Sequence, residues 1–174
     1  MDKQTLDNIL SPLHAPEIIG RADTDTRAAM KEQHDNNDWL SQQTVTTLNW
    51  LFAGIGGALA WAASLVSGHL GAVMVGAIAL CAYLIAVAAY LVLAGFALRD
   101  FPAQHADARG WLYAPESDPE DVRRQVLLGL LERLDKASRH NAGKAAVLNR
   151  ARWLAVASPL VPLLVGLLAR RLGW

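Results

Sequence analysis

The sequence predicts an all-α membrane protein with a transmembrane helical hairpin, a third C-terminal span and cytoplasmic amphipathic helices. The first observation is a run of 29 apolar or small residues, Leu70–Leu98, without a charge or a proline. The second is another apolar run, Leu48–Val66, which precedes it. The third is the composition, because 53% of the 174 residues are hydrophobic and only 18% are charged. A helix crosses a bilayer core with about 20 residues, so both runs are long enough to span.

Residues 1–47 are predicted to form a cytoplasmic helical arm. A short amphipathic helix is indicated by apolar residues at helical spacing, namely Leu6, Ile9, Leu10 and Leu13. Pro12 and Pro16 limit that helix. Thr24 or Asp25 is suited to cap a second, polar helix, which we expect to run from about Thr26 towards the membrane. The few apolar contacts expected for it are Met30, Trp39 and Leu40.

Residues 48–98 form the predicted hairpin, with a tight turn at Ser67-Gly68-His69. Small residues recur at helical spacing in both spans, namely Gly54, Gly57, Ala58, Ala60, Ser64, Ala72 and Gly76. Small side chains let two helix backbones approach closely in lipid. They predict either packing of the two spans against each other or contacts between subunits around a pore, and both interpretations stay open here.

The distribution of basic residues predicts the orientation. The turn contains no Lys or Arg, whereas residues 1–40 contain four and residues 99–152 contain ten. Cytoplasmic loops carry the excess of basic residues. We therefore expect a multi-pass protein with a cytoplasmic N-terminus. Because the first 40 residues lack an apolar signal segment, we expect the internal apolar segments to direct insertion.

Residues 99–152 are predicted to be cytoplasmic, with a loop over 101–118 followed by an amphipathic helix. Asp118-Pro119-Glu120-Asp121 is typical of a helix start. One side of the helix is apolar, with Val122, Val126, Leu127, Leu130, Leu131 and Leu134. We expect the helix to continue through Arg152, with a bend near Gly143.

Residues 153–174 contain a last apolar segment, Trp153–Ala169, whose 17 residues are at the lower limit for a span. Pro159 and Pro162 predict a kink in it. Arg170 and Arg171 would lie outside if it crosses, against the orientation trend, so a re-entrant or surface-lying segment is the alternative to a third span.

No catalytic residue, metal site or cofactor is expected. The first two spans contain no ionisable residue of the kind that pumps and coupled transporters place there. The chain has no phosphate-binding glycine loop and no metalloprotease or serine-hydrolase motif. His105 with Asp107, and His140 with Asn141, lack a metal-ligand partner at a suitable spacing. An enzyme is therefore not predicted.

A basic stretch precedes the last apolar segment, with Arg123, Arg124, Arg139, His140, Lys144, Arg150 and Arg152. One interpretation is a solvated helix face with contacts to lipid headgroups. The other is an anion site, repeated by oligomer symmetry, that holds a nucleotide or phosphate ligand.

The order of segments resembles that of the SLATT-type and Pycsar-type transmembrane effectors of bacterial antiphage defence. The shared features are a polar N-terminal helix, the hairpin 48–98, and a cytoplasmic amphipathic helix whose stretch 141–151 leads into an apolar segment. The apolar tail 153–169 departs from the two-span layout usual for SLATT proteins.

This resemblance implies a homo-oligomer, a tetramer by analogy, that forms a gated ion channel or pore in the bacterial inner membrane. A nucleotide messenger, or the enzyme or partner protein associated with it, would open the pore through the cytoplasmic helices. The alternative is a non-conducting membrane anchor or scaffold that recruits a soluble partner.

Overall fold

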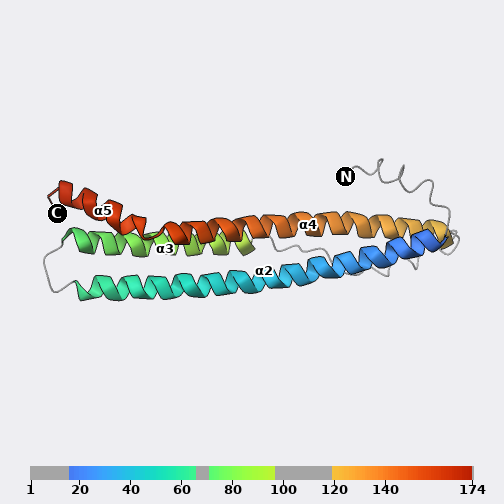
Figure 1. Ribbon diagram of the computed structural model, residues 1–174, viewed down its shortest axis with the longest axis horizontal. Coiled ribbons are helices and arrows are strands. Elements are labelled where there is room, and N and C mark those ends of the chain that lie inside the picture. The colour runs from blue at the N-terminus through green and yellow to red at the C-terminus, as the bar shows by residue number, and fades with distance from the viewer. Residues whose placement is uncertain (1–15, 66–70, 97–118, 174) are drawn as a thin grey trace. The chain divides into compact units, whose positions relative to one another are not determined.

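The structure, a computed structural model, describes residues 16–65, 71–96 and 119–173. These residues form four helices, namely α2 (Pro16–Ser64), α3 (Ala72–Phe96), α4 (Pro119–Ala157) and α5 (Leu160–Arg171) (Figure 1). The all-α class is confirmed, since the described residues contain no strand. The predicted helix over 6–13, the turn at 67–69 and the loop over 101–118 lie outside the described residues.

The chain packs as two compact units. We call Met1–Trp39 with Asp100–Ala142 the polar unit, and Leu40–Arg99 with Gly143–Trp174 the apolar unit. Helices α2 and α4 each contribute residues to both. On the described helices these bounds lie before the predicted divisions at residues 47 and 152, because residues 40–47 and 143–152 belong to the apolar unit.

In the polar unit, α2 begins at Pro16, ten residues before the predicted start at Thr26. The prediction of an N-cap at Thr24 or Asp25 was therefore wrong. The hydroxyl groups of Thr24 and Thr26 donate to the carbonyl oxygens of Gly20 and Ala22, at 3.0 and 2.6 Å. A threonine can satisfy its hydroxyl in this way inside a helix, so a cap-forming residue type did not mark a helix start here.

The core of the polar unit contains apolar side chains and a polar contact between α2 and α4. Its buried side chains include Met30 of α2 and Leu127 and Leu130 of α4, which confirms the predicted amphipathic helix. The Nδ2 of buried Asn141 donates to the carbonyl oxygen of Gln33 at 2.8 Å and to its Oε1 at 2.9 Å. Trp39 is 54% exposed, so its predicted role as an apolar contact was wrong.

In the apolar unit, three helices share one hydrophobic core. Its buried members are Leu40, Leu48 and Leu51 of α2, Leu84, Val87, Ala88 and Leu91 of α3, and Leu148 and Ala151 of α4. Helix α5 packs against α3. The helical hairpin predicted over 48–98 is thus present as the second part of α2 and α3, and the polar helix continues directly into the first apolar segment.

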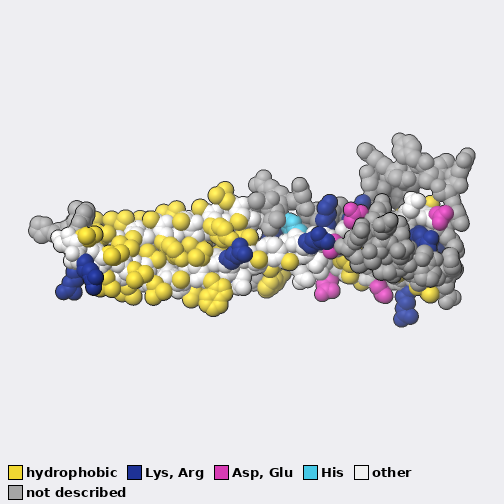
Figure 2. All heavy atoms as spheres, turned by 90° about the horizontal axis from the view of Figure 1, so that it is seen from above, with side chains coloured by type: hydrophobic (Ala, Val, Ile, Leu, Met, Phe, Trp, Pro, Cys, Tyr) yellow, Lys and Arg dark blue, Asp and Glu magenta, His cyan; other side chains and the backbone are white. Residues whose placement is uncertain are grey.

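The outer surface of the apolar unit is also hydrophobic. Figure 2 shows one face on which hydrophobic side chains form a continuous stretch, with Lys or Arg side chains at its two ends. Only 22% of the most apolar window of α2, and 33% of that of α3, is buried. A water-soluble domain rarely exposes so large an apolar surface. Both helices are long and apolar enough to cross a membrane, which indicates a membrane protein.

A break separates α4 from α5 at Ser158 and Pro159, where the two helices meet at a bend of 45°. Proline lacks an amide hydrogen, which removes helical hydrogen bonds. The remaining donors form shorter-range bonds instead, from Ser158 N to Ala155 O and from Val161 N to Ser158 O, both at 3.1 Å. The predicted proline kink is confirmed, whereas α4 passes through Gly143, the site of the expected bend, as a single helix.

The bent α4–α5 pair is compatible with two arrangements of the C-terminal apolar segment. Taken as one span, α4 and α5 bring the number of candidate membrane spans in the described residues from two to three. A 45° bend at the break is equally consistent with a re-entrant segment.

Candidate functional site

The predicted basic residues all lie on α4, but they divide between the two units. Arg123, Arg124, Arg139 and His140 belong to the polar unit, and Lys144, Arg150 and Arg152 to the apolar unit. Within the polar unit, Arg123 and Arg139 are separated by 16 residues, or about 24 Å along the helix. The two cannot contact the same small anion within one chain. A nucleotide site among them stays a prediction that requires residues from several copies.

Arg139 is held by a neighbour on its own helix. Its Nη2 lies 2.7 Å from Oδ2 of Asp135, and both side chains are largely exposed. Exposed pairs of this kind contribute about 0.2–1 kcal/mol at most. The arrangement is that of a solvated helix face.

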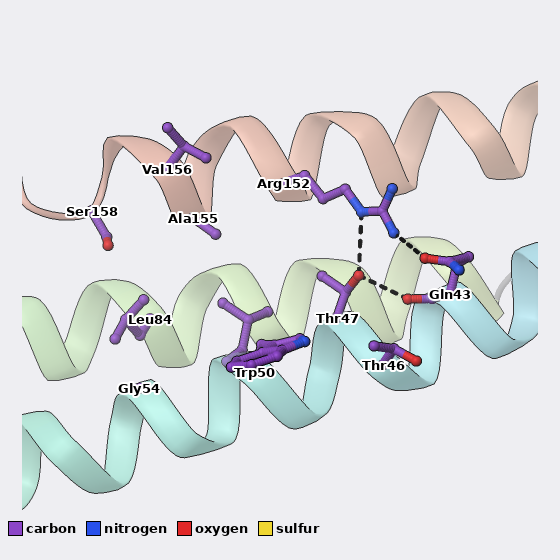
Figure 3. A pocket seen from close by; sticks show the side chains of 11 residues that line it. Gln43, Thr46, Thr47, Trp50, Gly54, Leu84, Arg152, Ala155, Val156 and Ser158 are labelled. Carbon is purple, nitrogen blue, oxygen red and sulfur yellow. Dashed lines mark hydrogen bonds between the residues drawn. The ribbon is translucent and has the colours of Figure 1, made fainter.

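The basic residues of the apolar unit reach across to α2. The Nζ of Lys144 donates to Oγ of Ser41 at 2.9 Å. The guanidinium of Arg152 donates from Nη2 to Oε1 of Gln43 at 2.5 Å and from Nε to Oγ1 of Thr47 at 3.4 Å. The hydroxyl of Thr47 donates in turn to the carbonyl oxygen of Gln43 at 2.8 Å (Figure 3). Arg152 is thereby fixed by neutral acceptors, and no carboxylate among the described residues forms a salt bridge with it.

A groove of about 540 Å³ opens beside this cluster. Its polar end contains Gln43, Thr46, Thr47 and Arg152. Its apolar end contains Leu51, Gly54, Leu84, Ala155 and Val156, and Trp50 and Ser158 complete the lining. Figure 3 shows the lining residues on α2, α3 and α4, with Arg152 pointing towards Gln43 and Thr47 of α2. Gly54 allows α2 to lie close to α3 at this end, since a Cβ at this position would lie 3.3 Å from Cδ1 of Leu84.

The predicted small residues fall into two groups. In the first group, Ala58 and Gly76 are buried, Ala72 is half-buried, and Gly54, although exposed, lies next to Leu84. Gly76 has the closest approach, because a Cβ there would lie 3.0 Å from the carbonyl oxygen of Pro162 in α5. Gly57, Ala60 and Ser64 are exposed. Packing between the two spans therefore accounts for Gly54, which faces Leu84, whereas Gly76 packs against α5, outside the hairpin. The second group is available to another helix.

A second groove, of about 670 Å³, lies between α3 and α5 and reaches Trp61 of α2. Most of its lining side chains are apolar, and Ser158 and Arg170 are the two polar residues in the lining. Such a mainly apolar surface suits the hydrocarbon chains of lipid.

The part of the chain that the structure describes does not contain a cluster of metal-binding side chains. There, no three His, Cys, Asp or Glu side chains lie close enough together to hold a metal ion. His140 is half-buried beside Asn141, which binds Gln33, and His105 and Asp107 lie outside the described residues. Cys81 is a buried free cysteine.

Sequence reasoning missed the partners of Arg152 and the role of Tyr83. Gln43 and Thr47 lie more than 100 positions from Arg152, and only the register of α4 against α2 brings them together. The hydroxyl of Tyr83 donates to the main-chain carbonyl oxygen of Leu154 in α4 at 3.0 Å. A tyrosine within the long apolar run was a usable signal, because its hydroxyl needs a hydrogen-bond partner there.

Comparisons with known proteins add no family to these observations. No family model, no curated protein and no solved structure matches this chain. The resemblance to antiphage effectors therefore rests on the order of its segments.

Proposed function

We propose that this chain is the subunit of a homo-oligomeric membrane effector that forms a gated ion channel or pore in bacterial antiphage defence. The hairpin of α2 and α3 and the bent α4–α5 pair would lie in the inner membrane. The polar unit would be cytoplasmic and would receive the opening signal, a nucleotide messenger or a partner protein.

The exposed face of α2 carries this proposal. Ala53, Gly57, Ala60 and Ser64 are all exposed and recur every three or four residues, on the side of the helix opposite the buried Leu51 and Ala58. We call these four residues the small-residue face. A Cβ on Gly57 would meet nothing within 4 Å in the same chain. In lipid, a face of this kind allows a second helix to approach closely.

Bulky residues border the small-residue face on both sides. Trp50 and Trp61 lie along one edge and Phe52 and Leu59 along the other, and all four are exposed. A strip of small residues between larger ones forms a shallow channel into which a neighbouring helix fits. A second copy of α2 supplies such a helix. If the small-residue face of one α2 meets a different face of the next copy, the contact is heterologous and can close a ring of subunits.

The lack of charge in the candidate spans favours a passive conducting path. No Asp, Glu, Lys or Arg lies within residues 48–64 of α2 or in α3. A path lined by small and apolar groups can be closed by exclusion of water and opened by a modest widening. The alternative is a non-conducting scaffold. It would form the same oligomer, but its central path would not widen and would not conduct ions.

The connection between signal and pore would run through α2 and α4. Each is a single helix with residues in both units. A ligand can shift the equilibrium between closed and open states only if it binds them with different affinity. The exposed charges of α4 in the polar unit provide groups that several copies could direct towards one anionic ligand.

The oligomer is tested by measuring the mass of the protein in nanodiscs for the wild type and for Gly57→Leu. We expect a defined oligomer for the wild type and smaller species for the variant, because leucine blocks close approach at the small-residue face. Gly20→Leu is the matched control, since a Cβ at Gly20 also meets nothing within 4 Å but lies in the polar unit. A monomeric wild type, or equal masses for all three proteins, would contradict the proposal.

A further inference from the structure

We propose that the groove beside Arg152 binds one anionic phospholipid, with the phosphate at Arg152 and the first part of an acyl chain along the apolar end. This inference rests on the membrane location in the proposed function and is independent of conduction. It assigns the groove a ligand class that differs from the nucleotide considered for the polar unit.

The guanidinium is oriented and retains free donor capacity. An arginine carries five N–H donors in a planar fork. Gln43 and Thr47 accept from Nη2 and Nε of Arg152, which holds the plane of the fork on the wall of the groove. At least two further N–H groups are not engaged by these bonds and can donate to phosphate oxygens.

The local charge favours an anion. No salt bridge to Arg152 is found among the described residues, and the other polar groups at this end are neutral. A phosphate monoanion would neutralise the guanidinium, whereas a zwitterionic headgroup would bring a second positive charge. The groove should therefore prefer anionic lipid.

Two tryptophans place the polar end at the depth of lipid headgroups. Trp50 lines the groove and is 75% exposed, and Trp153 follows Arg152 and is 70% exposed. Exposed tryptophans concentrate at the interface between headgroups and hydrocarbon. At the depth of these tryptophans, the lining of the groove changes from the hydroxyl and amide groups of Thr47 and Gln43 to the apolar side chains of Leu51 and Leu84.

The apolar end favours a lipid over a free phosphate compound. From Arg152 to Ser158 the groove follows about 9 Å of α4. Leu84, Ala155 and Val156 offer only hydrocarbon along this length. A soluble phosphate would leave these groups in contact with water, whereas an acyl chain would cover them.

Extraction of membranes at high pH first establishes that the protein is embedded in the bilayer. Lipid binding is then tested by native mass spectrometry of the full-length protein in detergent. Phosphatidylglycerol and phosphatidylcholine are titrated in parallel. We expect about tenfold tighter binding of phosphatidylglycerol to the wild type, and loss of this preference in Arg152→Gln. Arg150→Gln is the matched control, because Arg150 is an exposed arginine of the same helix that does not line the groove. The control should keep the preference.

A further variant separates binding from a structural role. Arg152→Lys keeps the positive charge but loses the planar fork that joins Gln43 and Thr47. If Arg152 binds phosphate, the lysine variant should retain part of the preference for phosphatidylglycerol. If Arg152 only fastens α4 to α2, both variants should lose helicity or thermal stability together without any change in lipid preference, which would overturn the inference.

The source of the phosphate is settled by competition. Glycerol 3-phosphate carries the same anionic group without acyl chains, and we expect more than a hundredfold weaker competition from it because the apolar end stays empty. Equal competition by glycerol 3-phosphate would assign the groove to soluble phosphate compounds and contradict a lipid site. Equal binding of both lipids to the wild type, or an equal loss in Arg150→Gln, would also contradict it. Failure of the channel proposal would leave these results unchanged.

Discussion

The hydroxyl of Tyr83 in α3 donates a hydrogen bond to the main-chain carbonyl oxygen of Leu154 in α4, at 3.0 Å. In an unbroken helix this carbonyl would accept from the amide of Ser158. That amide is bonded instead to Ala155 O, because Pro159 disrupts the regular pattern one residue later. Tyr83 therefore supplies a replacement donor next to a helix break, in a setting where water is excluded if the unit lies in lipid.

Removal of this hydroxyl should weaken the apolar unit. Tyr83→Phe leaves the Leu154 carbonyl without its side-chain donor, and we expect the free energy of unfolding to fall by about 1–2 kcal/mol. Unfolding in mixed micelles measures the change. Tyr90→Phe is the control, because the ring of Tyr90 packs against the same core and the substitution keeps the ring. Equal losses in both variants would contradict the role assigned to Tyr83.

The close packing of α3 against α5 at Gly76 should tolerate only glycine at this position. In Gly76→Ala the new Cβ would lie 3.0 Å from the carbonyl oxygen of Pro162, a backbone atom that moves only with α5. We expect a loss of about 1–3 kcal/mol, typical of overpacking. Gly57→Ala adds the same methyl group in open space. Denaturation of the monomeric protein in detergent should therefore show little or no loss for Gly57→Ala, and a comparable loss would contradict the packing of α5 on α3.

The stability of the polar unit should depend on Asn141. Asn141→Ala removes two hydrogen bonds to Gln33, each worth about 1 kcal/mol net, but it also removes a buried Oδ1 that has no hydrogen-bond partner in the described structure. We expect a net loss of about 1–2 kcal/mol in thermal unfolding. Asn149→Ala changes an exposed asparagine of the same helix and should change stability by less than about 0.5 kcal/mol. A stable Asn141→Ala protein would show that this contact is dispensable.

The helices could be predicted where one local signal dominated. The uncharged run Leu70–Leu98 predicts α3, and Pro119 with its acidic neighbours predicts the start of α4. Pro159 likewise marks the break before α5. The start of α2 was missed because Thr24 is equally able to cap a helix and to donate back within one.

The candidate sites were less predictable, because they depend on how the helices pack. The basic residues of α4 suggested anion binding, yet nothing local distinguishes Arg152, which is joined to Gln43, from the exposed Arg150 two positions away. The same limit applies to the small residues. Gly57 faces outward and Gly54 faces Leu84, and only the tertiary contacts separate them.

The most direct test of the central claim is a planar-bilayer recording of the purified protein with candidate nucleotides added to the side of the polar unit. We expect discrete conductance steps that appear with an activating nucleotide, that are absent in Gly57→Leu and that persist in Gly20→Leu. A wild-type protein that is oligomeric and inserted but stays silent with every ligand, while it retains a soluble partner, would contradict a pore and favour the scaffold.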